Sequence, residues 1–271
     1  MPRALNGSVE IEWSEQGEGE PLLLIMGLGG SSQAWYRLLP HLDGRLRAIS
    51  FDNRGTGRSS RVCGRVTLDD MVADTIAVMD AAGLQDAHVL GVSMGGMIAQ
   101  RLTLDHRERV RSLILGCTTP QARNGVPPWR LISAAAVRAV APDVATSLLV
   151  PALYSERTRR DSPERVREDL EMRRRDATPP QTVLAQMAAV AGHDTRARLD
   201  QLAGLAVTVI HGDEDALVSV ERGRQLASLI PGAALVEIRG CGHVLLTDAQ
   251  DEVIAAFDAH LMAVGAVTMA A

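Results

Sequence analysis

The segment His88-Val89-Leu90-Gly91-Val92-Ser93-Met94-Gly95-Gly96-Met97 joins two sequence patterns over a short distance. It begins with a continuous apolar run, His88 to Val92, which is typical of a strand buried on both faces, and it leads into Met97 to Leu104, where apolar residues follow a helical period. Between them Ser93 stands in the pattern G-x-S-x-G, followed by a further glycine. A serine on a sharp strand-to-helix turn has a strained backbone, and glycines relieve crowding around it. A phosphate-binding glycine turn is the less favoured interpretation. The segment predicts a Ser93 hydroxyl exposed at the carboxyl edge of a sheet.

Strand and helix patterns alternate through most of the chain. Segments with helical period, such as Leu68 to Met79, separate the apolar runs, which predicts a mainly parallel α/β sheet with helices on both faces. At the start of the chain Asn6-Gly7 predicts a type I′ hairpin, with two antiparallel strands ending near Trp13. The expected central strands are Leu22 to Met26, Leu46 to Phe51, His88 to Val92, Val110 to Leu115, Val207 to His211 and Leu235 to Ile238.

The alternation stops between about Thr119 and Leu205, where the sequence reads as several helices. Ser162-Pro163-Glu164 supplies an N-cap and a proline for the first turn of one helix, and Thr178-Pro179-Pro180 marks a break before the next. We therefore expect an α/β core made of residues 1–118 and 206–271, with residues 119–205 inserted as a helical cap.

The inserted stretch from Glu156 to Asp176 is dense in charge, with eight arginines and seven acidic residues. Pairs of opposite sign lie four residues apart, as in Asp161/Arg165, Asp169/Arg173 and Glu171/Arg175, which is the spacing of ion pairs on a helix surface. A solvated, salt-bridged face is favoured over a phosphate-binding or nucleic-acid-binding one.

All 28 basic side chains are arginines. Without lysine the chain has no amine for Schiff-base catalysis, pyridoxal phosphate or a Walker A loop. The net charge of −5 disfavours nucleic acid and anionic lipid as partners and favours a small molecule. The three cysteines, Cys63, Cys117 and Cys241, follow no metal or disulfide spacing and are interpreted as reduced structural thiols. A polar stretch at Met1 to Trp13 and the absence of a long apolar run predict a soluble, cytoplasmic protein without a membrane span.

A serine hydroxyl needs a base and an orienting carboxylate to act as a nucleophile. His243, in the glycine-rich turn Gly240-Cys241-Gly242-His243, is the candidate base. Asp215, which follows the preceding strand, is the candidate carboxylate, with Asp213 as the alternative. His211 at a strand end and His193 at the end of the insertion are interpreted as structural residues. No cluster with metal-ligand spacing is present, so no metal and no cofactor are expected.

These elements together resemble the α/β-hydrolase family over almost the whole chain. The further motifs are Met26-Gly27-Leu28-Gly29-Gly30, Asp52 to Ser59, H-G-x-x-D ending at Asp215 and G-x-G-H ending at His243. The resemblance implies an eight-stranded sheet, with Ser93 as nucleophile, His243 as base and Asp215 as orienting acid. It also implies an oxyanion hole formed by the backbone N–H groups of Leu28 and Met94.

One position departs from the common family pattern. Met26-Gly27 stands where His-Gly is usual, so a side chain that braces the oxyanion loop is missing, and Met26 is proposed to line the substrate site instead. The resemblance assigns Asp52 and Arg54 a structural turn. In the cap, Trp129 is a candidate substrate contact with packing as an equal alternative, whereas packing is favoured for Tyr154, Met172 and Met187.

The function expected from this set is hydrolysis of a carboxylic ester or lactone of a small, largely apolar substrate. The general pattern resembles bacterial enol-lactonases and polyketide methyl esterases. Thioester hydrolysis and a non-hydrolytic step, such as cyclisation, lyase chemistry or cofactor-free perhydrolysis, remain alternatives, because fold does not decide chemistry. A ligand-binding receptor with a vestigial site is disfavoured because every triad position is filled. Whether the chain is a monomer or a homodimer stays open.

Overall fold

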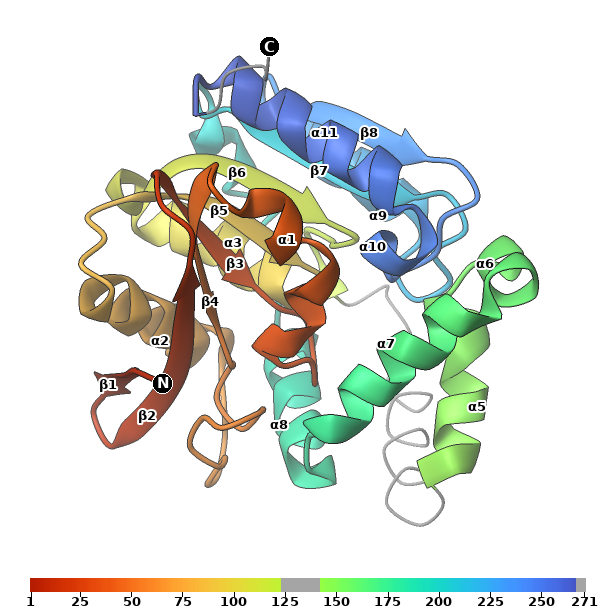
Figure 1. The fold of residues 1–271 in the computed structure, drawn as a ribbon. Coiled ribbons are helices and arrows are strands. Elements are labelled where there is room, and N and C mark those ends of the chain that lie inside the picture. The colour runs from red at the N-terminus through yellow and green to blue at the C-terminus, as the bar shows by residue number, and fades with distance from the viewer. Residues whose placement is uncertain (123–141, 267–271) are drawn as a thin grey trace.

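The computed structural model describes residues 1–122 and 142–266, and these form an eight-stranded sheet between two layers of helices (Figure 1). The strand order is β1-β2-β4-β3-β5-β6-β7-β8, and the strands from β3 to β8 run parallel while β2 is antiparallel to its neighbours β1 and β4. All six predicted central strands are confirmed to within about two residues. The strands are β1 (Arg3–Asn6), β2 (Val9–Gln16), β3 (Glu20–Ile25), β4 (Leu46–Phe51), β5 (Ala87–Val92), β6 (Val110–Gly116), β7 (Val207–Gly212) and β8 (Ala234–Ile238).

The opening hairpin is confirmed, but its turn is not the predicted one. Asn6 pairs with Val9, so Gly7 and Ser8 are the central residues, and the second strand runs on to Gln16. A type I′ turn needs positive φ at both central residues, whereas only Gly7 has it, with φ of 60°. The Asn6 side chain instead donates to Asp74 Oδ1 at 2.8 Å, which attaches the hairpin to a helix.

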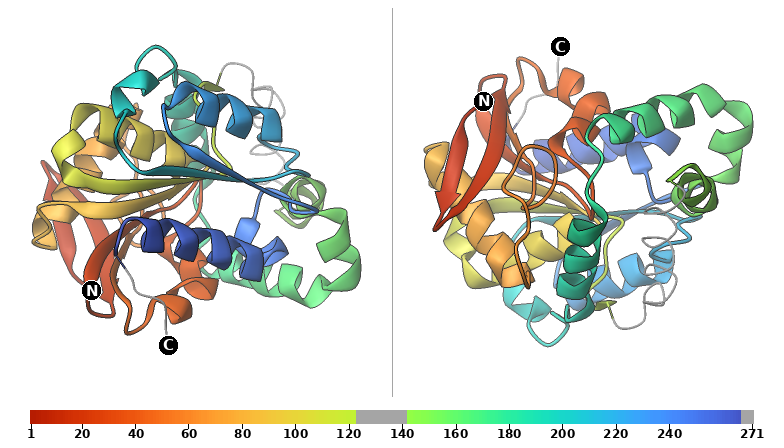
Figure 2. Two further views of the ribbon diagram at one scale, coloured as in Figure 1. Left: turned by 90° about the horizontal axis from the view of Figure 1, so that it is seen from above. Right: turned by 90° about the horizontal axis from the view of Figure 1, so that it is seen from below.

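Helices cover both faces of the sheet, and Figure 2 shows the sheet edge-on between them. The α2 and α3 helices pack on one face together with α9, as their apolar residues predict, while α1 and α11 pack on the other. Helix α2 begins at a capping box in which Thr67 and Asp70 exchange hydrogen bonds. The bounds are α1 (Leu39–Leu42), α2 (Leu68–Ala81), α3 (Met94–Asp105), α9 (Val220–Leu229), α10 (Leu245–Asp248) and α11 (Gln250–Ala263), with short 3₁₀ helices η1 (Ser32–Arg37), η2 (Arg107–Arg109) and η4 (Leu199–Leu202).

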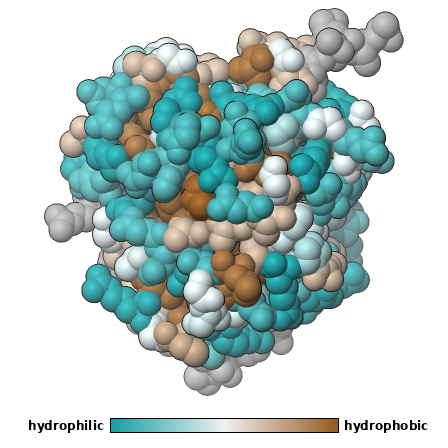
Figure 3. All heavy atoms as spheres, turned by 90° about the vertical axis from the view of Figure 1, so that its left-hand side faces the viewer, coloured by the Kyte–Doolittle hydropathy of each residue, from teal (hydrophilic) through white to brown (hydrophobic). Residues whose placement is uncertain are grey.

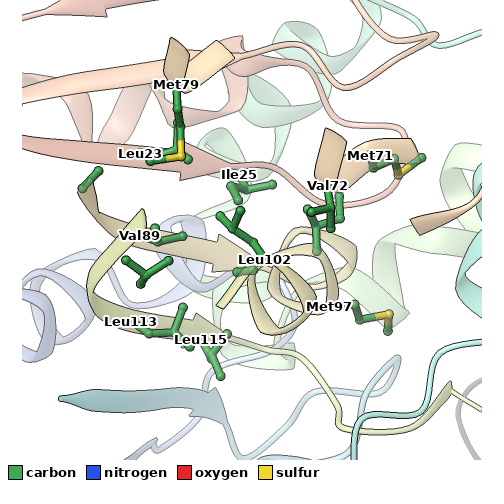
Figure 4. Packing of buried hydrophobic residues seen from close by; sticks show 14 of the residues in the cluster. Leu23, Ile25, Met71, Val72, Met79, Val89, Met97, Leu102, Leu113 and Leu115 are labelled. Atoms are coloured by element: carbon green, nitrogen blue, oxygen red, sulfur yellow. The ribbon is translucent and has the colours of Figure 1, made fainter. Parts of the chain in front are cut away.

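Each helical layer buries its own apolar cluster against the sheet. Under α2 and α3 the side chains of Leu23 and Val89 meet those of Met79 and Leu102, all of which are buried (Figure 4). Burying one such side chain contributes about 1.5–3 kcal/mol. The two clusters hold the central strands in register, and this register fixes where the strand ends and their loops lie.

Among the described residues, four helices between β6 and β7 lie outside the two layers, at one end of the sheet, and are here called the insertion helices (Figure 2). Pro163 begins a helix after Ser162, and Pro180 begins the next one, as the sequence predicts. The exact division into residues 1–118, 119–205 and 206–271 stays a prediction. The insertion helices are α5 (Pro142–Leu153), α6 (Glu156–Asp161), α7 (Pro163–Arg175) and α8 (Pro180–Ala191).

The solvated ion-pair face predicted for α7 is wrong in part. Asp169 is buried, and it accepts hydrogen bonds from Arg173 Nε at 2.8 Å and from the Tyr154 hydroxyl. Arg165 does not pair with Asp161 but donates to the backbone oxygens of Thr247, at 2.9 Å, and Leu246. Asp161 ends α6 whereas Arg165 belongs to α7, so this pair does not share a helix, while Glu171 and Arg175 are exposed as predicted.

In the described ranges no helix is both long and apolar enough to cross a bilayer. On the face beside β1 and β2, hydrophilic side chains predominate and hydrophobic ones are interspersed among them (Figure 3). The exposed large apolar side chains, among them Leu5, Leu148 and Met262, lie on separate elements.

Candidate active site

The site lies at the topological switch point of the sheet, where the chain changes the side on which it adds strands. After β3 the chain crosses to β4 on one side, and after β5 it crosses to β6 on the other. Loops that diverge from adjacent parallel strands leave a crevice at their carboxyl ends, which is where such sheets bind ligands. Ile25 pairs with Gly91, so the two diverging loops begin side by side. One of them carries Leu28 and the other carries Ser93.

Ser93 lies on a sharp turn between β5 and α3, as predicted. Its φ of 54° and ψ of −120° fall in a region that residues with side chains rarely adopt. A Cβ atom at Gly95 would lie 2.1 Å from the Ile25 oxygen, and one at Gly91 would lie 2.4 Å from the Gly95 oxygen. The two glycines therefore allow the turn to press against β3. The Thr118 hydroxyl donates to the Ser93 carbonyl at 2.7 Å and holds the strained turn from the β6 side.

The structure brings the three proposed catalytic side chains into one hydrogen-bonded row. Ser93 Oγ lies 3.1 Å from His243 Nε2, and His243 Nδ1 lies 2.7 Å from Asp215 Oδ2. The three residues come from β5–α3, from the loop after β7 and from the loop after β8, so the row is assembled by the parallel register of the sheet. In this geometry the imidazole can take the hydroxyl proton while the carboxylate fixes its tautomer.

Asp215 is held as a carboxylate. Burial favours its neutral form, but His243, a hydrogen bond from His211 and the neighbouring backbone donors outweigh burial and hold the pKa of Asp215 well below its usual range. Its Oδ1 accepts from the N–H groups of Leu217 and Val218, both at 2.9 Å. The second oxygen is thereby left to orient the imidazole ring of His243.

Two alternatives considered for the row take other partners. Asp213 is exposed and accepts from the Gly240 N–H at 2.6 Å, so it supports the turn before His243 instead of contacting the ring. His211 is fully buried, with Nε2 at 2.7 Å from the Val218 oxygen and 3.4 Å from Asp215 Oδ2. It therefore helps to fix the Asp215 turn from behind, in line with the structural role expected for it.

The loop that carries His243 is anchored by a residue that the sequence analysis missed. Asp248 accepts from the Gly242 N–H at 2.6 Å and from the Ser155 N–H at 2.9 Å, so one carboxylate joins this loop to the insertion helices. The Val244 N–H donates to the Leu153 oxygen at 3.0 Å beside it. Burial raises the pKa of Asp248 in spite of these donors.

The loop after β3 forms a β-turn that leaves one backbone donor free. The Gly30 N–H donates to the Gly27 oxygen at 3.2 Å, and Gly29 has φ of 67°, so Leu28 and Gly29 are the central residues of a type II turn. The Gly29 N–H donates to Gln186 Oε1 at 2.8 Å. Among the described residues neither the Leu28 N–H nor the Met94 N–H has an acceptor. A Cβ atom at Gly27 would lie 3.0 Å from Ser93 Cβ, which brings this turn against the serine.

The Met26 side chain packs against Gly30 of this loop, while other side chains supply its hydrogen bonds. The Asn53 amide donates to the Met26 oxygen at 2.8 Å, and the Thr178 hydroxyl donates to the Gly29 oxygen at 2.9 Å. The Met26 side chain is largely buried in the apolar cluster beside Trp35, so its contact with substrate stays a prediction. Trp129 lies outside the described residues.

The Asp52 to Ser59 stretch has the structural role expected for it. Asp52 is buried and accepts from the N–H groups of Ser32, at 2.7 Å, and Arg58, at 3.0 Å. Arg54 forms a bidentate pair with the buried Asp74, at 2.5 and 2.7 Å. Through Asn53, Arg54 and Ser59 this stretch therefore ties the loop after β3 to α2 and β2.

The cysteines offer no reactive thiolate at the site. Cys117 and Cys241 are buried, and burial raises the pKa of both thiols. Cys63 is exposed, and the structural role expected for it stays a prediction. Within residues 1–122 and 142–266, Cys117 joins Asp215 and His243 in the one group whose ligand atoms lie close enough to share a metal ion. His243 and Asp215 already bond to each other at 2.7 Å, closer than two ligands of one zinc ion stand, so the residues fit a proton relay better than a metal centre.

Comparison with known proteins agrees with this geometry. Residues 20–250 match the family model described as the alpha/beta hydrolase fold. The chain belongs to the α/β hydrolase family. An α/β hydrolase of this kind carries its chemistry on the loops at the carboxyl edge of the sheet, which is where Ser93, Asp215 and His243 lie.

The similar proteins differ in the substrates that they are named for. This α/β hydrolase is 30% identical over 231 residues to a putative carbamate hydrolase of Caulobacter segnis, covering 83% of this chain and 84% of that protein. It superposes with a TM-score of 0.87 on an esterase of Thermogutta terrifontis at 26% identity, covering 97% and 99% of the two chains. It superposes with a TM-score of 0.83 on Est816, described as an N-acyl homoserine lactone degrading enzyme, at 27% identity and 95% and 99% coverage.

Sequence reasoning found the row of side chains but missed most of what holds it. Asn53, Gln186 and Asp248 each join a loop of the candidate site to another part of the chain. For Gln186 there was a signal, since it is an amide on the same helix as Ala185, Ala189 and Val190, which pack on the apolar cluster. Asn53 lies inside a motif that was read only as a turn.

Proposed function

We propose that this α/β hydrolase is a serine hydrolase that cleaves a carboxylic ester or lactone through an acyl-enzyme. The observation that carries the proposal is the hydrogen-bonded row from Ser93 through His243 to Asp215, next to two backbone N–H groups that have no acceptor among the described residues. A nucleophile, a base and two converging donors are the parts that acyl transfer needs.

The mechanism follows from these positions. Ser93 Oγ attacks the carbonyl carbon while His243 Nε2 takes its proton, and Asp215 stabilises the imidazolium that forms. The negative charge on the carbonyl oxygen is met by the Leu28 and Met94 N–H groups. His243 then gives the proton to the leaving alkoxide, and on the return half it activates water to release the acid and free Ser93.

The substrate class is proposed from the chemistry and from the relatives together. An ester or lactone has a leaving alkoxide that the His243 proton neutralises. The names of the similar proteins extend the set to carbamates, whose carbonyl reacts in the same way. The relatives named for esters and for N-acyl homoserine lactones support a small acyl compound as partner.

We propose a small, largely apolar substrate, as the sequence analysis expects. The protein has no lysine, so a carboxylate on the substrate would be met by an arginine fork. With a net charge of −5 and no span-length helix among the described residues, we propose a cytoplasmic enzyme whose partner is neither nucleic acid nor membrane.

The test is turnover of short p-nitrophenyl esters, simple lactones and alkyl carbamates by the wild type, Ser93→Ala and the matched control Ser228→Ala. Ser228 is an exposed serine on α9 whose hydroxyl donates to the Gln225 oxygen of the same helix. We expect Ser93→Ala to lose about 10³-fold or more in kcat with the fold intact, and Ser228→Ala to match the wild type. Equal activity of wild type and Ser93→Ala would overturn the mechanism.

A second measurement separates hydrolysis from acyl transfer. Turnover in ¹⁸O-water places label in the released acid only if water accepts the acyl group. Unlabelled product in the presence of a thiol, an amine or hydrogen peroxide would assign the same residues to transfer, and labelled acid from a thioester would broaden the substrate class.

A further inference from the structure

The Gln186 side chain joins α8 to the loop that carries the proposed oxyanion donor. Gln186 is fully buried, and its amide uses both ends, because Oε1 accepts from the Gly29 N–H at 2.8 Å and Nε2 donates to the Arg54 oxygen at 3.2 Å. A backbone N–H and a carbonyl oxygen require opposite ends of the amide, so these two partners allow only one orientation of the group. The buried amide of Gln186 therefore forms a rigid connection between the Gly29 N–H and the Arg54 oxygen.

The turn geometry determines which N–H group Gln186 binds and which one remains available to a ligand. In the type II turn Gly27-Leu28-Gly29-Gly30 the turn itself uses the Gly30 N–H, so the N–H groups of Leu28 and Gly29 are free to bond elsewhere. Gln186 takes the Gly29 N–H, and the Leu28 N–H remains for a ligand. The Thr178 hydroxyl donates to the Gly29 oxygen at 2.9 Å, so the carbonyl of Gly29 is fixed as well as its N–H.

The hydrogen bonds that hold Gly29 from outside the turn do not come from the core. The Asn53 amide fixes the Met26 oxygen at the beginning of the loop, 2.8 Å away. Beyond it, the hydrogen bonds to Gly29 from outside the turn come from Gln186 and Thr178, which both belong to the insertion. Leu28 lies between the two anchors. Its N–H direction therefore depends on a core contact on one side and on insertion contacts on the other.

We propose that Gln186 is a positioning residue for the oxyanion hole. In the common family pattern a histidine stands at the position of Met26 and braces this loop, and here Gln186 braces it from the insertion. This inference rests on the proposed function. Gln186 does not touch the reacting atoms, and it acts through the Leu28 N–H. An N–H that is misaimed by about 1 Å stabilises a developing oxyanion poorly while ground-state binding is almost unchanged.

The kinetic test compares Gln186→Met, which removes both hydrogen bonds at similar volume, with Gln186→Glu, which keeps an acceptor for the Gly29 N–H. The matched control is Gln181→Met on the exposed side of the same helix. We expect Gln186→Met to lower kcat about 10- to 100-fold with KM changed less than about threefold, Gln186→Glu to lose less, and Gln181→Met to match the wild type. Affinity for an alkyl boronic acid, whose tetrahedral adduct places an oxygen in the hole, should fall in proportion to kcat.

A merely structural role gives a different result. It would lower the melting temperature or the folded fraction while leaving kcat per folded molecule and the boronate affinity unchanged, and that outcome overturns the proposal. Hydrogen exchange on the peptide spanning the turn reports the bond itself, since Gln186→Met should remove protection at Gly29. Lost protection with unchanged kcat also overturns the proposal.

The same variants separate this inference from the proposed function. If the wild type reacts with a fluorophosphonate at Ser93 but turns over no ester, lactone or carbamate, the substrate assignment fails. The inference is then judged by the rate of phosphonylation, which also passes through an oxyanion, and an unchanged rate in Gln186→Met overturns it. If Ser93 of the wild type does not react at all, both fall together.

Discussion

His260 on α11 lies in a buried chain of hydrogen bonds under the sheet, away from the catalytic loops. Its Nε2 lies 2.8 Å from Ser112 Oγ and its Nδ1 lies 2.8 Å from Thr208 Oγ1, while His88 Nδ1 shares the Ser112 hydroxyl at 2.7 Å. Burial, together with the neighbouring His88, lowers the pKa of His260 from 6.5 to about 4. The folded protein therefore keeps this imidazole neutral at a pH where the unfolded chain would protonate it.

The sign of the effect on stability follows from proton uptake. With a folded-state pKa below the unfolded value, the unfolded chain binds more protons as the pH falls below 6.5, so the contribution to folding is complete above that pH and is lost toward the folded pKa of about 4. Each pKa unit corresponds to about 1.4 kcal/mol, so the shift is worth about 3 kcal/mol in full. Between about pH 7 and about pH 5 the loss in the free energy of unfolding is about 2 kcal/mol.

The assay is urea denaturation of the wild type and His260→Gln at a series of pH values. Glutamine does not titrate and can bond to either hydroxyl, so the variant is expected to lose about 2 kcal/mol less than the wild type between about pH 7 and about pH 5. Above about pH 7 the two stability curves should run parallel, which serves as the internal control. Parallel curves across the whole range would refute the reasoning, because they would mean that His260 takes up no more protons when the chain unfolds.

Further substitutions test the site and the core. Asp215→Asn should lower kcat about 10⁴-fold by leaving His243 in the wrong tautomer, whereas Asp213→Asn should stay within about threefold, as steady-state kinetics with a p-nitrophenyl ester will show. Gly95→Ala places a Cβ atom 2.1 Å from the Ile25 oxygen, so we expect at least about 1–3 kcal/mol of destabilisation and a lower melting temperature; a wild-type melt would contradict the contact. Leu226→Ala, at a fully buried position of α9, should lower the free energy of unfolding by about 2–5 kcal/mol in urea without changing KM.

The fold and the candidate catalytic residues could be predicted from the sequence because both depend on local patterns. Apolar runs separated by helical periods marked the strands, and glycines around Ser93 marked a turn whose backbone permits little else. The partners of the loops could not be read in this way. Gly29 and Gln186 are 157 positions apart, and nothing in either local pattern indicates that one amide will meet the other. Asp169 likewise has the spacing of a surface pair, and only packing shows that its carboxylate is buried.

The contacts that the sequence did not reveal constrain how a substrate reaches Ser93. Gln186 and Thr178 bond to Gly29 on the oxyanion side, and on the side of the base Leu153 accepts from the Val244 N–H while Asp248 accepts from the Ser155 N–H. Lifting the insertion helices as a body would break these four hydrogen bonds, at a cost of about 1 kcal/mol each and more wherever a donor stayed buried without water.

That cost is a sizeable part of the roughly 5–15 kcal/mol that stabilises a typical domain. It would also release the turn that carries Leu28 and the loop that carries His243 at the moment when both must be in place. We therefore expect the described insertion helices to stay seated during turnover. We therefore expect the anchored helices to act as a fixed wall of the proposed active site. Substitutions at the residues that anchor them should change kcat more than KM.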